Sequence, residues 1–222
     1  SDYIALLPKE RIDLESEEDN LKISCNKQKT KIKTQPATDF PLIPKIEKTK
    51  PFIISAKDFK QAISEIVFAV SNSETRPEIS GVYINFNGDK LIMAATDSYR
   101  LTEKKINLVE KNSQENKNVI VPVKTLQEIS RILGIFREDV SMENIENIEI
   151  YLSENQIMFS YNGVDLISRL IEGQYPDYVQ IIPTTLKTKI KINNKELIKA
   201  VKTSSLFTKN GIYDVRLDFN PE

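Results

Sequence analysis

Two carboxylates in this sequence lie beside side chains that could share acid–base chemistry with them. Asp97 precedes Arg100 by three residues, and Asp177 adjoins Tyr178. The chain has no His and one Cys, so it lacks the commonest general base and the usual zinc ligands. Its six Gly leave no glycine-rich phosphate loop. The sequence therefore predicts no catalytic residue, no metal site and no cofactor.

The composition is that of a soluble globular protein, with 40% hydrophobic and 28% charged residues. The apolar runs are too short to span a bilayer, and we see no apolar signal segment at the N-terminus. The single Cys25 suits a reducing cytosol, and we expect it to be an ordinary strand residue. A formal net charge of −1 neither favours nor excludes nucleic acid, because the placement of charge decides that.

A first set of elements is predicted from residue 52 onward. A short strand at 52–55 leads into a helix with Ser55 as its N-cap and Asp58 completing a capping box. Three strands follow, at 82–86, at 91–96 and after residue 100. The apolar face of the helix recurs at helical spacing and comprises Phe59, Ala62, Ile63, Ile66, Val67 and Val70.

The same order recurs further along the chain. A strand at 119–121 leads through Pro122 into a second helix, which we expect to end at Gly134. Three more strands are predicted at 148–152, 157–161 and 164–171. The second helix has its own apolar face, formed by Val123, Leu126, Ile129, Ile132 and Leu133. Residues 52–171 are thus predicted to form two successive strand–helix–three-strand units, which is an α+β fold.

A longer repeat lies on top of this one. The stretch Lys57-Asp58-Phe59 is echoed 138 positions later by Lys195-Glu196-Leu197, and residues 81–87 are echoed by 214–220. Echoes in the same order at nearly one offset indicate tandem domains of ordinary size.

Domain boundaries follow from this repeat. We predict the C-terminal part of a first domain at 1–45, a complete second domain at 46–185 and the N-terminal part of a third at 186–222. The segments 45–51 and 183–188 are the predicted linkers between these domains.

Four stretches carry a family resemblance. They are Arg76-Pro77 with Ile79-Ser80-Gly81-Val82, Ala95-Thr96-Asp97-Ser98-Tyr99-Arg100-Leu101, Val119-Ile120-Val121-Pro122, and Gly173-Gln174-Tyr175-Pro176-Asp177-Tyr178. Over nearly the whole chain, the sequence resembles a truncated fragment of the bacterial DNA polymerase III beta subunit, the beta sliding clamp. The second and fourth stretches are specific when found together at this separation.

The resemblance implies a DNA-clamp fold with helices on the inner face and sheets outside. In this family two three-domain subunits close head to tail into a ring around duplex DNA, and the ring is non-catalytic. Implied partners are double-stranded DNA bound without sequence preference, a replicative DNA polymerase subunit, the clamp loader, other proteins with a clamp-binding motif, and a second copy of the full-length chain. The implied location is the bacterial cytoplasm, at the nucleoid.

The hydrophilic sides of the predicted helices would then face the DNA, together with a loop at 71–77. The implied DNA-facing residues are Lys57, Lys60, Arg76, Lys124, Arg131, Lys195, Lys199 and Lys202. Without the resemblance, each Lys would be interpreted as an ordinary solvated residue. Glu65 and Glu128 lie on the same helices and dilute the positive charge.

The resemblance also implies a hydrophobic groove that receives a short peptide from each partner. The matching positions are Ile79, Thr96, Ser98, Tyr99, Arg100, Leu101, Pro176, Gln180 and Ile181. Ser98 and Tyr99 depart from the Gly and His of many family members, and Gln180 departs from the Arg of some. Without the resemblance, Thr96 and Asp97 would only end a strand and Pro176 would only stiffen a linker.

Three other interpretations remain open at this point. The chain could be an enzyme that uses one of the carboxylate pairs, although no motif supports this. It could be a non-enzymatic protein-interaction module of αβ repeats, which would not need positive helix faces. It could also be a clamp-like paralogue from a phage, plasmid or organelle.

Overall fold

The computed structural model describes residues 2–39, 46–73, 75–110, 116–138, 146–208 and 214–219. Parts of the predicted first linker and of the 214–220 repeat lie outside these residues. The chain divides into two compact units, Ser1–Tyr175 and Pro176–Glu222. No described helix is both long enough and apolar enough to cross a membrane.

The N-terminal segment forms a small antiparallel meander. A short helix, α1 (Asp2–Ala5), precedes β1 (Asp13–Glu17), β2 (Asn20–Cys25) and β3 (Gln28–Lys33). The strands pair in the order β1-β2-β3, and a 3-10 turn at Ala37–Asp39 follows them. Leu7, Ile23 and Cys25 form a small core of their own. Cys25 is a buried strand residue, as the sequence predicted.

The first predicted strand–helix–three-strand unit is confirmed. It comprises β4 (Phe52–Ser55), α2 (Ala56–Ile66), β5 (Gly81–Asn87), β6 (Lys90–Thr96) and β7 (Leu101–Asn107), with 3-10 turns η2 (Val67–Ala69) and η3 (Pro77–Ile79). Ser55 is the N-cap, since its hydroxyl accepts a hydrogen bond from the Asp58 N–H at 3.3 Å. The helix is shorter than its apolar spacing predicted, because the chain tightens into η2 after Ile66.

The second unit is confirmed as well. It comprises β8 (Lys117–Pro122), α3 (Val123–Glu138), β9 (Asn147–Leu152), β10 (Gln156–Tyr161) and β11 (Val164–Arg169). The predicted helix end at Gly134 is wrong, because α3 continues through Gly134 to Glu138. Glycine at this position permits a close approach instead: a Cβ there would lie 2.9 Å from Lys60 Nζ of α2.

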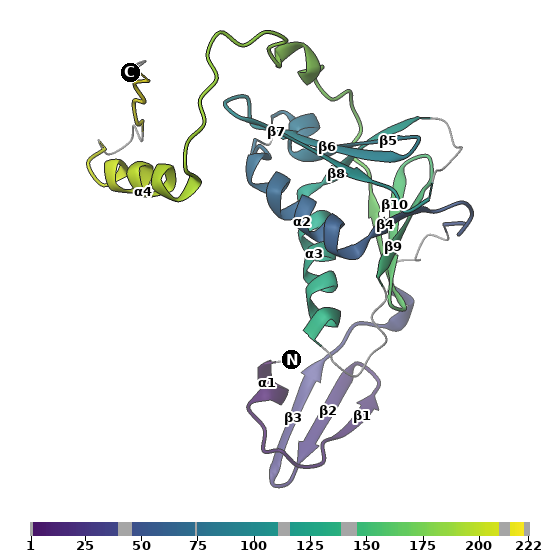
Figure 1. Ribbon diagram of the computed structural model, residues 1–222. Coiled ribbons are helices and arrows are strands. Elements are labelled where there is room, and N and C mark those ends of the chain that lie inside the picture. The colour runs from purple at the N-terminus through teal and green to yellow at the C-terminus, as the bar shows by residue number, and fades with distance from the viewer. Residues whose placement is uncertain are drawn as a thin grey trace. The chain divides into compact units, whose positions relative to one another are not determined.

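The two units exchange their first strands. One sheet has the order β11-β10-β9-β4, so β4 of the first unit pairs with the second unit's meander. The other sheet has the order β7-β6-β5-β8, so β8 of the second unit pairs with the first unit's meander. Figure 1 shows both sheets with α2 and α3 beside them. Residues 52–171, called the double repeat below, therefore cannot be split without opening both sheets.

One hydrophobic core runs through the double repeat and is lined by both helices and both sheets. Helix α2 contributes Phe59 and Ile63, and α3 contributes Leu126 and Ile129, all almost fully buried. The Phe59 ring stacks near that of Phe159, with centroids 5.8 Å apart. The two helices contact each other, so both apolar faces turn to the same core and both hydrophilic faces remain exposed.

The compact unit Pro176–Glu222 contains a 3-10 turn, η4 (Tyr178–Ile181), and a helix, α4 (Asn194–Ser205). Asn193 caps α4 by accepting hydrogen bonds from the N–H groups of Lys195 and Glu196. Residues 214–219 echo the sequence of β5 but form no strand in the described part of the chain. A strand requires a partner for its backbone groups, and β5 obtains its partners from β6 and β8.

Glycine substitutions test this packing with opposite expected signs. A Cβ at Gly81 would lie 2.7 Å from both Ile171 Cδ1 and the Val121 carbonyl oxygen. We expect Gly81→Ala to lower the free energy of unfolding by about 1–3 kcal/mol, measured by urea denaturation. Gly134→Ala displaces only the mobile end of Lys60 and should raise it by roughly 0.5–1 kcal/mol, because alanine favours the helix. Equal effects at both sites would contradict this packing.

Candidate functional site

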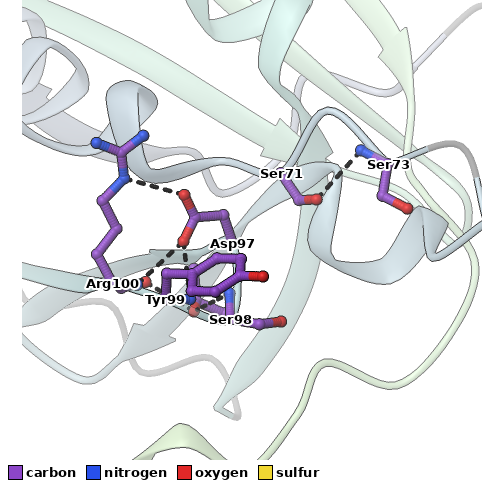
Figure 2. Close-up of polar contacts among 7 residues, drawn as sticks. Ser71, Ser73, Asp97, Ser98, Tyr99 and Arg100 are labelled. Atoms are coloured by element: carbon purple, nitrogen blue, oxygen red, sulfur yellow. Dashed lines mark hydrogen bonds and ion pairs between the residues drawn. The ribbon is translucent and has the colours of Figure 1, made fainter. Parts of the chain in front are cut away.

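The loop between β6 and β7 holds the densest set of predicted site residues, Thr96 to Leu101. Thr96 Oγ1 accepts from the Ser98 N–H at 3.1 Å and donates to the Arg100 carbonyl at 2.8 Å. Asp97 Oδ1 accepts from the N–H groups of Tyr99 and Arg100, each at 3.0 Å. Figure 2 shows the Asp97 carboxylate at the centre of this loop. The loop is therefore a hydrogen-bonded turn rather than a loose strand end.

Asp97 accepts several hydrogen bonds within the loop. Its Oδ2 also receives a hydrogen bond from Arg100 Nε at 3.0 Å. Backbone hydrogen bonding from Arg100, followed by that from Tyr99 and by the Arg100 side chain, outweighs partial burial and holds the Asp97 pKa below its ordinary value. A carboxylate held ionised by three donors is a poor proton acceptor. The Asp97–Arg100 pair therefore orders the loop.

The rest of the loop presents side chains to solvent. Tyr99 is 98% exposed at the turn, and Leu101 is half-buried at the start of β7. The Arg100 guanidinium lies 5.5 Å from the ring centroid of Phe68, which is itself exposed on η2. Such a cation–π contact adds a modest stabilisation and fixes the direction of the Arg100 side chain. Phe68 was not among the residues predicted from the sequence, because its spacing places it off the apolar face of the helix.

Two further residues of the family motifs are buried. Ile79 is only 1% exposed, so it offers no surface of its own to a ligand. Tyr175 is buried with its ring 5.2 Å from that of Tyr83. Burial raises the pKa of Tyr175 to about 12, although hydrogen bonding with the Thr96 backbone opposes the shift. Tyr175 therefore stays neutral and links the family motif at 173–178 to the end of β6.

The remaining predicted groove residues belong to the compact unit Pro176–Glu222. Pro176 and Gln180 are exposed, and Ile181 is 71% exposed. Gln180 Nε2 donates to Asp177 Oδ2 at 2.7 Å, which orders the start of η4. Asp177 is thus a partner of an amide.

The predicted DNA-facing residues of the double repeat are exposed or half-buried on α2 and α3. Lys57 and Lys60 lie one turn apart on α2, and Lys124 and Arg131 lie two turns apart on one side of α3. Among the described residues, no carboxylate forms an ion pair with Lys57, Lys60 or Lys124. Within the described part of the chain, these three ammonium groups are therefore not held in an ion pair.

Two acidic residues on the same helices, Glu65 and Glu128, are paired with cations, whereas Asp58 of α2 is exposed and forms no ion pair among the described residues. Glu65 pairs with Lys104 of β7 at 2.7 Å and also accepts a hydrogen bond from Gln61, and both interactions lower its pKa. Glu128 accepts from Arg131 Nε at 3.0 Å, which lowers the Glu128 pKa. From the sequence alone, Glu65 and Glu128 would reduce the positive charge of the helix face. In the structure, Lys104 of β7 balances Glu65, and Arg131, three residues further along α3, balances Glu128.

Helix α4 carries the third predicted set of cations. Lys195, Lys199 and Lys202 are all exposed on it. Its apolar residues Ile198 and Val201 are also partly exposed, at 46% and 37%.

Among the described residues, no group of three or more His, Cys, Asp or Glu side chains could hold a metal ion.

Two interlocked strand–helix–three-strand units with exchanged first strands and a cation-bearing helix pair define a clamp-type α+β protein. The family profile for the DNA polymerase III beta subunit, central domain, matches residues 53–177. The Staphylococcus aureus beta sliding clamp is 38% identical over 172 residues, which are 78% of this chain and 43% of that protein. The chain belongs to the DNA polymerase III beta subunit family.

Solved structures agree with this assignment. The DNA polymerase sliding clamp of Bacillus subtilis superimposes with a TM-score of 0.84 at 33% identity, over 96% of this chain and 54% of that one. A sliding clamp of Bartonella birtlesii bound to griselimycin superimposes with a TM-score of 0.81 at 27% identity, over 94% of this chain and 55% of that one. The chain spans less than half of the length of the curated relatives it matches.

The role of Asp97 can be tested through the pH dependence of stability. Because its folded-state pKa is lowered, the carboxylate stabilises the fold above its ordinary pKa, and this stabilisation is lost as pH falls through the folded-state pKa. We expect Asp97→Asn to cost about 1 kcal/mol near neutral pH and almost nothing in acid, measured by urea unfolding across pH. The exposed turn residue Asp89 offers the control: Asp89→Asn should leave the profile unchanged.

Proposed function

We propose that this chain is part of a DNA sliding clamp, a non-catalytic subunit that encircles duplex DNA and tethers a replicative polymerase to it. Family membership carries the proposal, and the lysines on the paired helices α2 and α3, which form no ion pair with a described carboxylate, support it. A protein-interaction module built from the same repeats would not need positive helix faces. The double repeat would then be the core of the complete second domain at 46–185.

The electrostatics suit sliding. Lys57, Lys60 and Lys124 have no ion-pair partner among the described residues, so they can meet phosphates through a loose, hydrated layer. Contacts of this kind carry no sequence information and weaken as salt rises, because they release counterions from DNA. Closure of the ring around the duplex, rather than tight contact, would hold the clamp on DNA. Lys195, Lys199 and Lys202 on α4 would extend the same surface in the third domain.

Charge reversal on the two helices tests the DNA surface. We expect the triple variant Lys57→Glu, Lys60→Glu and Lys124→Glu to bind a fluorescent duplex at least about tenfold more weakly at low salt. Its slope of log affinity against log salt should be smaller by about three units, because each of the three lysines would otherwise neutralise one phosphate. Fluorescence anisotropy across a salt series measures both quantities.

A matched control separates position from net charge. Lys9, Lys27 and Lys90 are exposed and lie outside α2 and α3, so their replacement by Glu changes net charge equally. Under the proposal this control keeps most of its affinity and its salt slope. Equal losses in the two triple variants would leave the helix face without a special role.

We further propose that the β6–β7 loop belongs to the groove that receives a peptide segment of polymerase, clamp loader or other partners. Leu101 and Ile181 would supply apolar contact, and Thr96, Arg100 and Gln180 would supply polar contact. Griselimycin, bound by the Bartonella birtlesii clamp, is proposed as a ligand of the same groove. The remaining groove and the homodimer contact would come from parts of the full-length subunit.

An acidic substitution in the apolar wall tests this groove. In the full-length clamp, Leu101→Asp together with Ile181→Asp should weaken binding of griselimycin and of a labelled polymerase peptide by at least about a hundredfold, because a charge would be buried against an apolar ligand. Isothermal titration calorimetry gives the affinities. Val109→Asp, at an exposed position just beyond the other end of β7, is the control and should bind normally. Unchanged binding in the double variant would misplace the groove.

A further inference from the structure

Arg76 and Ser98 come from the two surfaces that the proposed function treats separately. Arg76 was assigned to the DNA path, and Ser98 was assigned to the partner groove. In the structure, Arg76 Nη2 donates a hydrogen bond to Ser98 Oγ at 2.9 Å across 22 positions of sequence. One side chain therefore bridges the segment leading into η3 and the turn between β6 and β7.

The backbone at Ser98 is held in a conformation that serine rarely adopts. Its φ of 77° lies in the left-handed region, where glycine is favoured and a Cβ is disfavoured. The surrounding turn keeps it there, because the Ser98 N–H bonds to Thr96 Oγ1 and the next two N–H groups bond to Asp97. A serine at this φ is strained, and its hydroxyl supplies the acceptor for Arg76.

Arg76 is anchored at its backbone, and its guanidinium has more donors than the one that bonds to Ser98. It is the N-cap residue of η3, and the Ile79 N–H bonds to its carbonyl at 3.3 Å while Ile79 is buried in the core. Among the described residues, no carboxylate forms an ion pair with Arg76. A guanidinium has five N–H donors, so Arg76 can still bind an anion.

We infer that Ser98 is a positioning residue that holds Arg76 against the β6–β7 turn, and that a DNA backbone phosphate competes with it for the guanidinium. A charge-assisted hydrogen bond to phosphate is stronger than a hydrogen bond to a neutral hydroxyl. Bound DNA therefore draws the Arg76 guanidinium away from Ser98. The turn at 97–100 then loses its external support and loosens. DNA binding and the partner groove are thereby coupled through one side chain, and the coupling is reciprocal. This inference rests on the proposed DNA and partner sites.

The test is the solvent-exchange rate of the Tyr99 and Arg100 backbone amides, read by NMR on the whole 222-residue chain. We expect addition of a short random-sequence duplex at low salt to speed exchange by about threefold to tenfold, the effect of losing one hydrogen bond of modest strength. Anisotropy of the labelled duplex in the same samples measures DNA binding independently.

Two variants of Ser98 distinguish a role in positioning Arg76 from a role in the stability of the fold. Ser98→Gly removes the acceptor and the backbone strain, so it should fold at least as stably while its amides exchange quickly with or without duplex. Ser98→Asn keeps an oxygen acceptor and tolerates the left-handed region, so it should restore the response to duplex. A role in stability alone would not produce this pattern.

The outcomes are distinguishable. Duplex binding without any change in exchange, or an equal response in Ser98→Gly and the wild type, overturns the coupling and leaves the proposed function intact. Absence of duplex binding by the wild-type chain overturns the DNA surface first, and the coupling falls with it because no phosphate competes for Arg76.

Discussion

Pairing of β4 with β9 and of β8 with β5 is the constraint on which the double repeat depends. Each meander has three strands of its own and gains a fourth from the other unit, so neither sheet is complete alone. The exchange places both inner faces around one core and leaves α2 and α3 to cover it together. Burial of this core is the main driving force for folding. The packing of α2 and α3 against the sheets therefore determines which face of each helix remains exposed to solvent, and helix propensity does not.

The two candidate surfaces follow from that arrangement. The helix pair exposes Lys57, Lys60 and Lys124 because the opposite side of each helix is buried. The β6–β7 loop lies where β6 ends and β7 begins, and buried Tyr175 forms a hydrogen bond with the Thr96 backbone there. A site built on strand ends and buried supports is more precise than one on a long loop, which suits the recognition of a short peptide.

The net charge of the exposed helix faces depends on which acidic residues are paired with cations, and a sum over the sequence does not show this. The net charge of −1 and the acidic residues of α2 and α3 argue against a polyanion partner when they are simply summed. Lys104 from β7 reaches Glu65, and Arg131 folds back to Glu128, so these two acids are balanced locally. Lys57, Lys60 and Lys124 form no ion pair with a described carboxylate, and the field of such charges falls off within a Debye length, so it acts only on a partner that comes close.

The sequence by itself determined the order of the elements and the family. Apolar periodicity of 2 and 3.6 residues marks the strands and helices of both units, since each element must bury one face, and the motifs at 95–101 and 173–178 indicate the clamp family. Tertiary structure alone decided which unit each first strand joins, because strand pairing leaves no local pattern. It also decided that α3 runs through Gly134 close to Lys60, that Ile79 is buried, and that Arg76 reaches Ser98. Each of these depends on contacts between residues distant in the chain, which spacing and composition do not encode.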